Sequence, residues 1–207
     1  MQKEITNIIR ENKKRNDTLF PEYNPLTGQG SPIERFKFRI SKDSFVMLPK
    51  TMLDIPQINF IHSKGGLHKI KKTQKEVDKF YIDLYKLRQK HDFEYWAYIC
   101  IKILDKKTKK YIQFRLRAAQ RKLLYELEKL RLAHQPIRII LLKARQWGGS
   151  TLVQIYMMWI QTQHKQNWHS VIGTDVQSQA NNIRSMYKEA CSRYPKNIGK
   201  LTMKPFE

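Results

Sequence analysis

The segment that most constrains the fold is an apolar run, IRIILL at 137–142, which leads into a loop with two adjacent glycines. Pro136 and Gly148 bound the run, and such a β-branched and leucine-rich stretch is typical of a strand buried on both faces of a parallel sheet. The segment after the loop, LVQIYMMWIQTQ, predicts an apolar helix. Strand, glycine loop and helix in this order indicate an α/β nucleotide-binding sheet.

Hydrophobic spacing predicts further elements on both sides of this unit. They are helices over 74–90, 118–134 and 176–191, a hairpin from 98–104 and 111–116, and short strands at 36–40, 58–61 and 169–174. Residues 1–73 are rich in Pro and Gly and show no sustained period. We therefore predict an α/β fold over 91–207, with a partial parallel sheet and flanking helices. A mixed α+β extension with one amphipathic helix precedes it over 1–90.

Composition excludes several classes of protein. The longest apolar run, IYMMWI at 155–160, is far shorter than the roughly 18 residues that span a bilayer. The first residues lack the apolar core of a secretory signal. Two cysteines without metal spacing favour a reducing cytosol. We therefore expect neither a secreted nor a membrane-spanning protein.

The net charge is +22, from 40 basic and 18 acidic residues. The excess is distributed along the chain, with 19 basic and 10 acidic residues in 1–90 and 21 and 8 in 91–207. Such a balance favours an anionic partner, because Lys and Arg displace counterions from phosphates. A generally basic surface without a nucleic-acid partner is the alternative.

The loop KARQWGGST at 143–151 departs from the standard phosphate-binding pattern, GxxxxGK[ST]. The second glycine (Gly148) and the hydroxyl (Ser150) are in register, but Lys143 replaces the first glycine and Gly149 occupies the lysine position. A lysine at the first position can still supply a point charge to a phosphate. The alternative is a strand-to-helix turn in which the glycines supply positive φ and the basic residues are solvated.

Together with the upstream segment FRLRAAQRKLLYELE, this loop resembles the amino-terminal ATPase region of the large terminase subunit of tailed bacteriophages. That family has a deviant phosphate loop in which the lysine can stand first, as Lys143 does here. The segment TDVQSQANNI at 174–183 also resembles the family's pattern after its second sheet strand. The resemblance covers about 112–190, and residues 1–90 resemble no family.

The resemblance implies that the α/β fold over 91–207 is of the P-loop NTPase type, with ATP and Mg²⁺ as cofactors, and it assigns roles to individual residues. Gln120 would bind adenine, since a side-chain amide can both donate to and accept from one base edge. Ser150 would hold Mg²⁺. The nucleotide-binding set would be Lys143, Arg145, Gln146, Gly148, Gly149, Ser150 and Thr151.

A working P-loop ATPase also needs an acidic residue on another strand to organise Mg²⁺. After Thr151 the chain has only Asp175, Glu189 and Glu207, none in an Asp-Glu pair. We therefore expect a truncated chain that lacks the Walker B acids, shows no catalytic residue and does not hydrolyse ATP alone.

The full-length protein would be an ATPase that packages double-stranded DNA into a procapsid in the host cytoplasm. Its further partners would be the portal and the small terminase subunit, in an oligomeric ring. The alternatives are a fragment of another P-loop helicase or translocase, and a non-enzymatic basic nucleic-acid-binding protein.

Overall fold

The computed structural model of this chain describes residues 2–19, 23–105, 108–142, 147–165 and 170–198. The chain divides into two compact units, each built from two separate stretches of sequence. The first unit comprises Met1–Leu84 and Leu116–Gly149, and the second comprises Tyr85–Arg115 and Ser150–Glu207. The domain boundary that the sequence predicts after residue 90 stays a prediction. Contacts between distant segments define the two units, and local patterns do not report such contacts.

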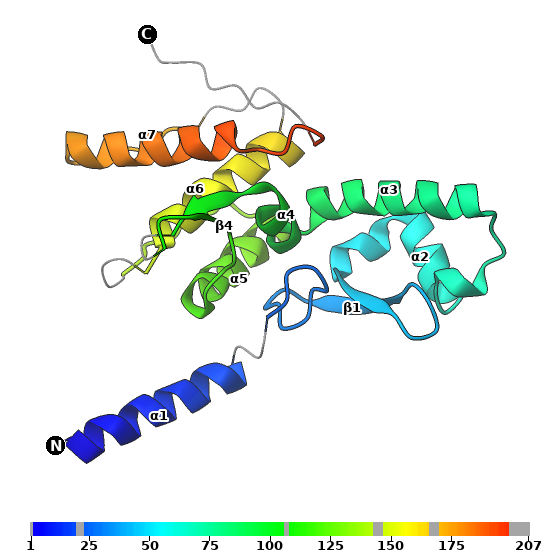
Figure 1. Ribbon diagram of the computed structural model, residues 1–207, viewed down its shortest axis with the longest axis horizontal. Coiled ribbons are helices and arrows are strands. Elements are labelled where there is room, and N and C mark those ends of the chain that lie inside the picture. The colour runs from blue at the N-terminus through cyan, green and yellow to red at the C-terminus, as the bar shows by residue number, and fades with distance from the viewer. Residues whose placement is uncertain (1, 20–22, 106–107, 143–146, 166–169, 199–207) are drawn as a thin grey trace, which may run out of the picture. The chain divides into compact units, whose positions relative to one another are not determined.

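The first unit combines a β-hairpin with helices (Figure 1). The hairpin strands pair antiparallel, with Phe38 opposite Val46. Phe38 is fully buried, and its ring stacks on that of Phe80 with 6.1 Å between the centroids. This unit holds α1 (Gln2–Leu19), β1 (Arg35–Arg39), β2 (Phe45–Pro49), η1 (Lys50–Asp54), α2 (Pro56–Ser63), η2 (Leu67–Lys69), most of α3 (Gln74–His91) and α5 (Ala118–Leu132).

A buried arginine joins the two stretches of the first unit. Arg121 of α5 donates from Nη1 to the carbonyl oxygen of Gly30 at 2.7 Å. Its guanidinium also lies 4.9 Å from the ring centroid of Tyr23, a cation–π arrangement. Both side chains are buried. These contacts fix α5 to residues 23–30, more than 90 positions earlier in the chain.

The second unit is built around two fully buried tryptophans. Trp96 donates from Nε1 to the hydroxyl of Tyr194 at 3.1 Å. Trp159 donates from Nε1 to the carbonyl oxygen of Gln89 at 2.8 Å, which satisfies its polar atom inside an apolar core. The elements are α4 (Phe93–Cys100), β3 (Lys102–Leu104), β4 (Tyr111–Gln113), α6 (Gly149–Trp159, whose first residue closes the first unit), the π-helical turn η3 (Ile160–His164) and α7 (Gln177–Ser192).

Most of the local predictions are confirmed. The predicted helices correspond to α3, α5, α6 and α7, the strand at 36–40 corresponds to β1, and β3 and β4 form the predicted hairpin. Strand predictions are wrong at four places in the described residues, namely 58–61, 98–100, 137–142 and 170–174. Residues 58–61 lie in α2, which Pro56 opens at its first position, where proline's missing N–H does no harm. Residues 98–100 lie in α4, whose N-cap Asp92 accepts a hydrogen bond from the backbone N–H of Tyr95 at 3.3 Å.

The helix α1 was not predicted from the sequence. Its apolar residues Ile5, Ile8 and Ile9 recur at helical spacing, yet all three are more than half exposed. Three isoleucines within an otherwise polar segment give only a short periodic signal, so the sequence indicates this helix weakly.

The predicted parallel sheet remains a prediction. Within the described residues, both sheets have two antiparallel strands, and no strand covers 137–142 or 170–174. The prediction that 137–142 is a buried strand is wrong for this structure, because Ile140 and Leu142 are fully exposed. A strand of a parallel sheet becomes buried only when neighbouring strands and helices cover it. The described residues supply no such neighbours.

Candidate nucleotide-binding site

The candidate site centres on Gly148 and Gly149, at the start of α6. Gly148 has φ of 87°, a left-handed conformation that glycine adopts without a steric penalty. Gly149 then begins α6, an 11-residue helix. The first backbone N–H groups of a helix have no partner within it and carry the positive end of its dipole. Lys143, Arg145 and Gln146 lie outside the described residues.

The structure brings Gln120 and Gly148 together across 28 residues of sequence. Nε2 of Gln120 donates to the carbonyl oxygen of Gly148 at 2.9 Å. Oε1 of Gln120 accepts from the backbone N–H of Arg117, also at 2.9 Å, which satisfies a free donor at the start of α5. Gln120 is 3% exposed. The residue expected to bind adenine therefore contacts the loop expected to bind phosphate.

These two bonds leave Gln120 with only part of its hydrogen-bonding capacity. A side-chain amide has two N–H donors and two acceptor lone pairs, so one of each remains for a base edge. Adenine binding by Gln120 stays a prediction. It requires a ligand that approaches a nearly buried side chain.

Ser150 and Thr151 lie in the first turn of α6. Ser150 is exposed, so its hydroxyl is accessible to an ion or a phosphate. Thr151 is half-buried and lines a pocket of the second unit. Their predicted roles toward Mg²⁺ and phosphate remain predictions.

The described residues fit Mg²⁺ only in part. No group of three or more His, Cys, Asp or Glu side chains gathers among them at a spacing that could hold a metal ion. Asp175 is exposed. Glu189 accepts a hydrogen bond from the Tyr111 hydroxyl at 2.9 Å and one from Arg193 at 3.1 Å. Those two bonds, that of Tyr111 first, lower the pKa of the Glu189 carboxyl. Ser150 is thus the one predicted Mg²⁺ ligand in the described structure.

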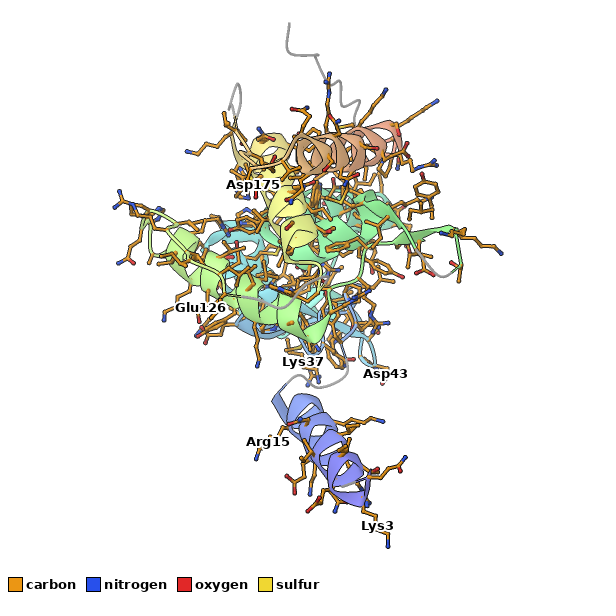
Figure 2. All side chains as sticks on the ribbon, turned by 90° about the vertical axis from the view of Figure 1, so that its left-hand side faces the viewer. Lys3, Arg15, Lys37, Asp43, Glu126 and Asp175 are labelled. Carbon is orange, nitrogen blue, oxygen red and sulfur yellow. The ribbon has the colours of Figure 1, made fainter. Side chains whose placement is uncertain are left out.

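Five of the 40 basic residues lie exposed on one helix. On α1, Lys3, Arg10, Lys13, Lys14 and Arg15 are all exposed. Figure 2 shows Lys3 and Arg15 projecting from this helix. Exposed cations of this kind bind phosphate backbones without reading base sequence.

Sequence reasoning missed one polar residue that the structure singles out. Gln154 was assigned only to the apolar helix after the loop, but its side chain is buried in the second unit. A single amide within the run LVQIYMMWI is the signal that could have indicated it, because a buried polar group needs a partner.

Comparison of the chain with protein-family models, with curated proteins and with solved structures found no match. None of the helices in the described part of the chain is long and apolar enough to cross a membrane.

The contact between Gln120 and Gly148 leads to a first prediction. A Cβ added to Gly148 would lie 2.7 Å from Nε2 of Gln120, and its φ of 87° is unfavourable for alanine. We expect Gly148→Ala to lower the free energy of unfolding by more than about 1 kcal/mol, measured by chemical denaturation.

Gly65→Ala is the matched control, because Gly65 has φ of 83° but no atom within 4 Å of an added Cβ. The amount by which Gly148→Ala lowers the free energy of unfolding more than Gly65→Ala does then measures the clash with Gln120. Equal losses in the two variants contradict the described contact.

Proposed function

We propose that this chain is the amino-terminal, ATP-binding part of a motor of the terminase large-subunit type, which packages double-stranded DNA. The observation that supports this proposal most strongly is the hydrogen bond between Gln120 and the Gly148 carbonyl at 2.9 Å. The resemblance assigns Gln120 to the adenine and Gly148 to the phosphates of one nucleotide, so a contact between the two residues supports a common site.

In this proposal the loop binds the phosphates. Lys143 and Arg145 supply positive charge, and the backbone N–H groups at Gly148 and Gly149 donate to phosphate oxygens at the start of α6. Ser150 offers its hydroxyl to Mg²⁺, and Gln146 and Thr151 complete the predicted set. When bound, Mg²⁺ would neutralise charge on the phosphates. In the chain of 207 residues we expect binding without turnover, because no carboxylate cluster is described that could organise the ion.

The basic surface is the proposed contact with DNA. A net charge of +22 with exposed cations on α1 supports binding to the phosphate backbone without base specificity. The portal, the small terminase subunit and a ring-shaped assembly in the host cytoplasm belong to the same proposal, and they follow from the resemblance alone.

The experiment is an equilibrium titration with a fluorescent ATP analogue at fixed salt and Mg²⁺. Lys143→Ala removes a charge-assisted contact to phosphate, so we expect binding to weaken about tenfold to a hundredfold. Lys129→Ala is the matched control, because it removes the same charge from an exposed position on α5. We expect its affinity to equal that of the unmodified chain.

Two outcomes would oppose the proposal. If the two lysine variants bind the analogue with the same affinity, the nucleotide is attracted by net charge and the loop is a turn. If no variant binds the analogue but all bind DNA, the chain is better explained as a non-enzymatic basic nucleic-acid-binding protein. Another P-loop translocase would give the same result as a terminase in this titration, and dependence of packaging on a procapsid separates the two.

A further inference from the structure

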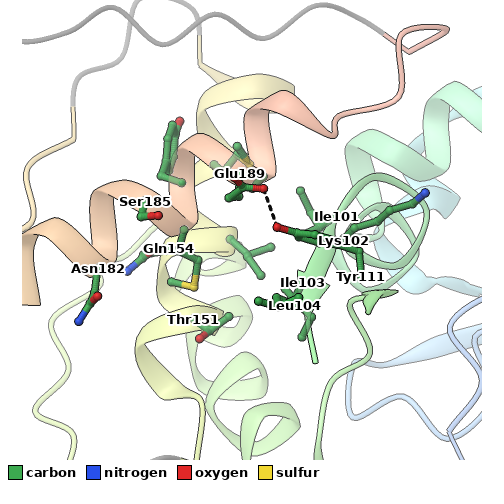
Figure 3. A pocket seen from close by; sticks show the side chains of 15 residues that line it. Ile101, Lys102, Ile103, Leu104, Tyr111, Thr151, Gln154, Asn182, Ser185 and Glu189 are labelled. Atoms are coloured by element: carbon green, nitrogen blue, oxygen red, sulfur yellow. Dashed lines mark hydrogen bonds between the residues drawn. The ribbon is translucent and has the colours of Figure 1, made fainter. Parts of the chain in front are cut away.

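The second unit contains a pocket of about 520 Å³ that shares only Thr151 with the proposed nucleotide site. Its walls are β3, α6 and α7, with Tyr111 of β4 at one side (Figure 3). The volume lies in the range of small-molecule sites, which are mostly apolar with a few polar groups that orient the ligand. The apolar wall includes Ile103, Leu104, Ile155, Met158, Met186 and Ala190.

Gln154 is the polar group that distinguishes this pocket from a packing defect. It projects from α6 into the space between α6 and α7 (Figure 3), and it is 4% exposed. Among the described residues, neither Oε1 nor Nε2 of Gln154 has a hydrogen-bond partner. Buried polar side-chain atoms in folded proteins nearly always have partners. A donor and an acceptor therefore lie side by side in an apolar pocket with their hydrogen bonds unmade.

The charged side chains that line the pocket form no hydrogen bond with the amide of Gln154. The carboxylate of Glu189 already accepts from Tyr111 at 2.9 Å and from Arg193 at 3.1 Å. Lys102 is exposed to solvent. Arg193 balances the charge of Glu189, whose side chain is 46% exposed, so this carboxylate gives a ligand little net attraction or repulsion. The pocket chemistry thus favours an uncharged ligand that pairs with one amide.

We propose that this pocket binds an uncharged, planar heterocycle that presents a hydrogen-bond donor next to an acceptor, as a cyclic amide does, to the side chain of Gln154. The two amide atoms form a pair of hydrogen bonds with that edge. The ring lies among the methionine, isoleucine and leucine side chains, whose flexible thioethers adapt to a flat apolar surface. Gln154 sets the orientation, and the apolar wall supplies most of the affinity. This inference does not depend on the proposed nucleotide binding.

Two probe molecules of nearly equal shape test it on the whole chain. In 2-quinolinone a ring N–H stands next to a carbonyl, whereas N-methyl-2-quinolinone lacks that donor. With ¹³C-methyl methionine labelling, we expect 2-quinolinone to shift the methyl resonances of Met158 and Met186. We expect the N-methyl compound to bind about tenfold more weakly, which is the effect of one lost hydrogen bond.

Gln154→Leu keeps the volume but removes both amide atoms. We expect this variant to lose the preference for 2-quinolinone and to bind the two probes equally. Gln113→Leu is the matched control, because it makes the same change at an exposed position of β4 that does not line the pocket. It should retain the tenfold preference.

The inference is overturned if the unmodified chain binds both probes equally or neither, or if the shifts fall only on other methionines. It is also overturned if Gln154→Leu keeps the preference. Should that variant not fold, the comparison of the two probes on the unmodified chain decides alone. Loss of ATP binding in Lys143→Ala leaves this result unchanged, so the two proposals fail separately.

Discussion

Trp159→Ala is expected to lower the free energy of unfolding by about 3–5 kcal/mol, as large-to-small substitutions of buried aromatic residues do. Trp159 is fully buried. Its ring lies 5.4 Å from that of Phe93, 5.7 Å from that of Tyr156 and 4.5 Å from that of His164, measured between centroids. Its indole N–H also donates to the carbonyl of Gln89 at 2.8 Å. Alanine would leave a cavity among these rings and remove that donor.

Trp159→Phe separates packing from hydrogen bonding. Phenylalanine fills most of the space but has no N–H, so we expect a loss of about 1–3 kcal/mol, the effect of a buried carbonyl without its partner. Urea denaturation followed by tryptophan fluorescence measures both variants. A loss below about 1 kcal/mol in Trp159→Ala would mean that the ring cluster is not the core of the second unit.

Asp92→Ala should lower the free energy of unfolding by about as much as Trp159→Ala does, because it breaks a buried ion pair. Oδ2 of Asp92 accepts from Nη2 of Arg88 at 3.2 Å, and the two side chains are 1% and 7% exposed. Asp92 also caps α4 through the backbone N–H of Tyr95, whose ring lies 3.8 Å from the Arg88 guanidinium. Removing one member of a buried ion pair costs about 3–5 kcal/mol, because the other charge stays buried without it.

Two further variants identify the cause of this loss. Asp92→Asn keeps an N-cap acceptor while it removes the charge, so we expect a loss smaller than that of Asp92→Ala. Glu34→Ala removes an exposed carboxylate that pairs with Lys50 at 2.6 Å, where both side chains are more than half exposed. Glu34→Ala should lower the free energy of unfolding by less than about 1 kcal/mol. Circular dichroism during denaturation follows the helices of both units and gives the free energy of unfolding of each variant. If Asp92→Ala and Glu34→Ala lower that free energy equally, the pair of Arg88 and Asp92 is not a buried one.

Sequence patterns predict α3, α5, α6, α7 and the β3–β4 hairpin, but they miss α1, α2 and α4. They also predict strands at 58–61, 137–142 and 170–174 that the described residues do not form. The helices α3, α5 and α7 have apolar residues at helical spacing, so each segment carries its own signal. The run at 137–142 has strong strand propensity, but propensity does not supply the neighbouring strands that would bury it. In the described structure Ile140 and Leu142 remain exposed. Strand formation depends on partners elsewhere, which a local pattern cannot report.

The segment 58–61, predicted as a strand, is a helix in the structure. Ile58 and Ile61 are three residues apart and both are buried on α2, which is helical spacing over a segment too short for a clear period. The division into units could not be predicted either. It depends on contacts such as that of Arg121 with Gly30, and no periodicity links those residues.

The candidate site was predictable only in part. The two glycines at the start of α6 and the role of the loop as a helix start follow from the sequence, and Gly148 has the positive φ that such a loop requires. The pairing of Gln120 with Gly148 needed the structure, because 28 residues separate them. The unsatisfied amide of Gln154 also needed it, since a glutamine within an apolar helix does not reveal whether it has a partner.

A titration of the ¹⁵N-labelled chain with Mg²⁺–ATP, followed through its backbone amide resonances, tests nucleotide binding at the loop most directly. Helix N-termini bind phosphates through their backbone N–H groups. We therefore expect saturable shifts of the Gly148, Gly149 and Ser150 amides with ATP, and much smaller shifts with adenosine, which has no phosphates. If ATP leaves these three amides unchanged, or shifts only exposed basic residues such as those of α1, the loop does not bind the nucleotide and the proposed function is contradicted.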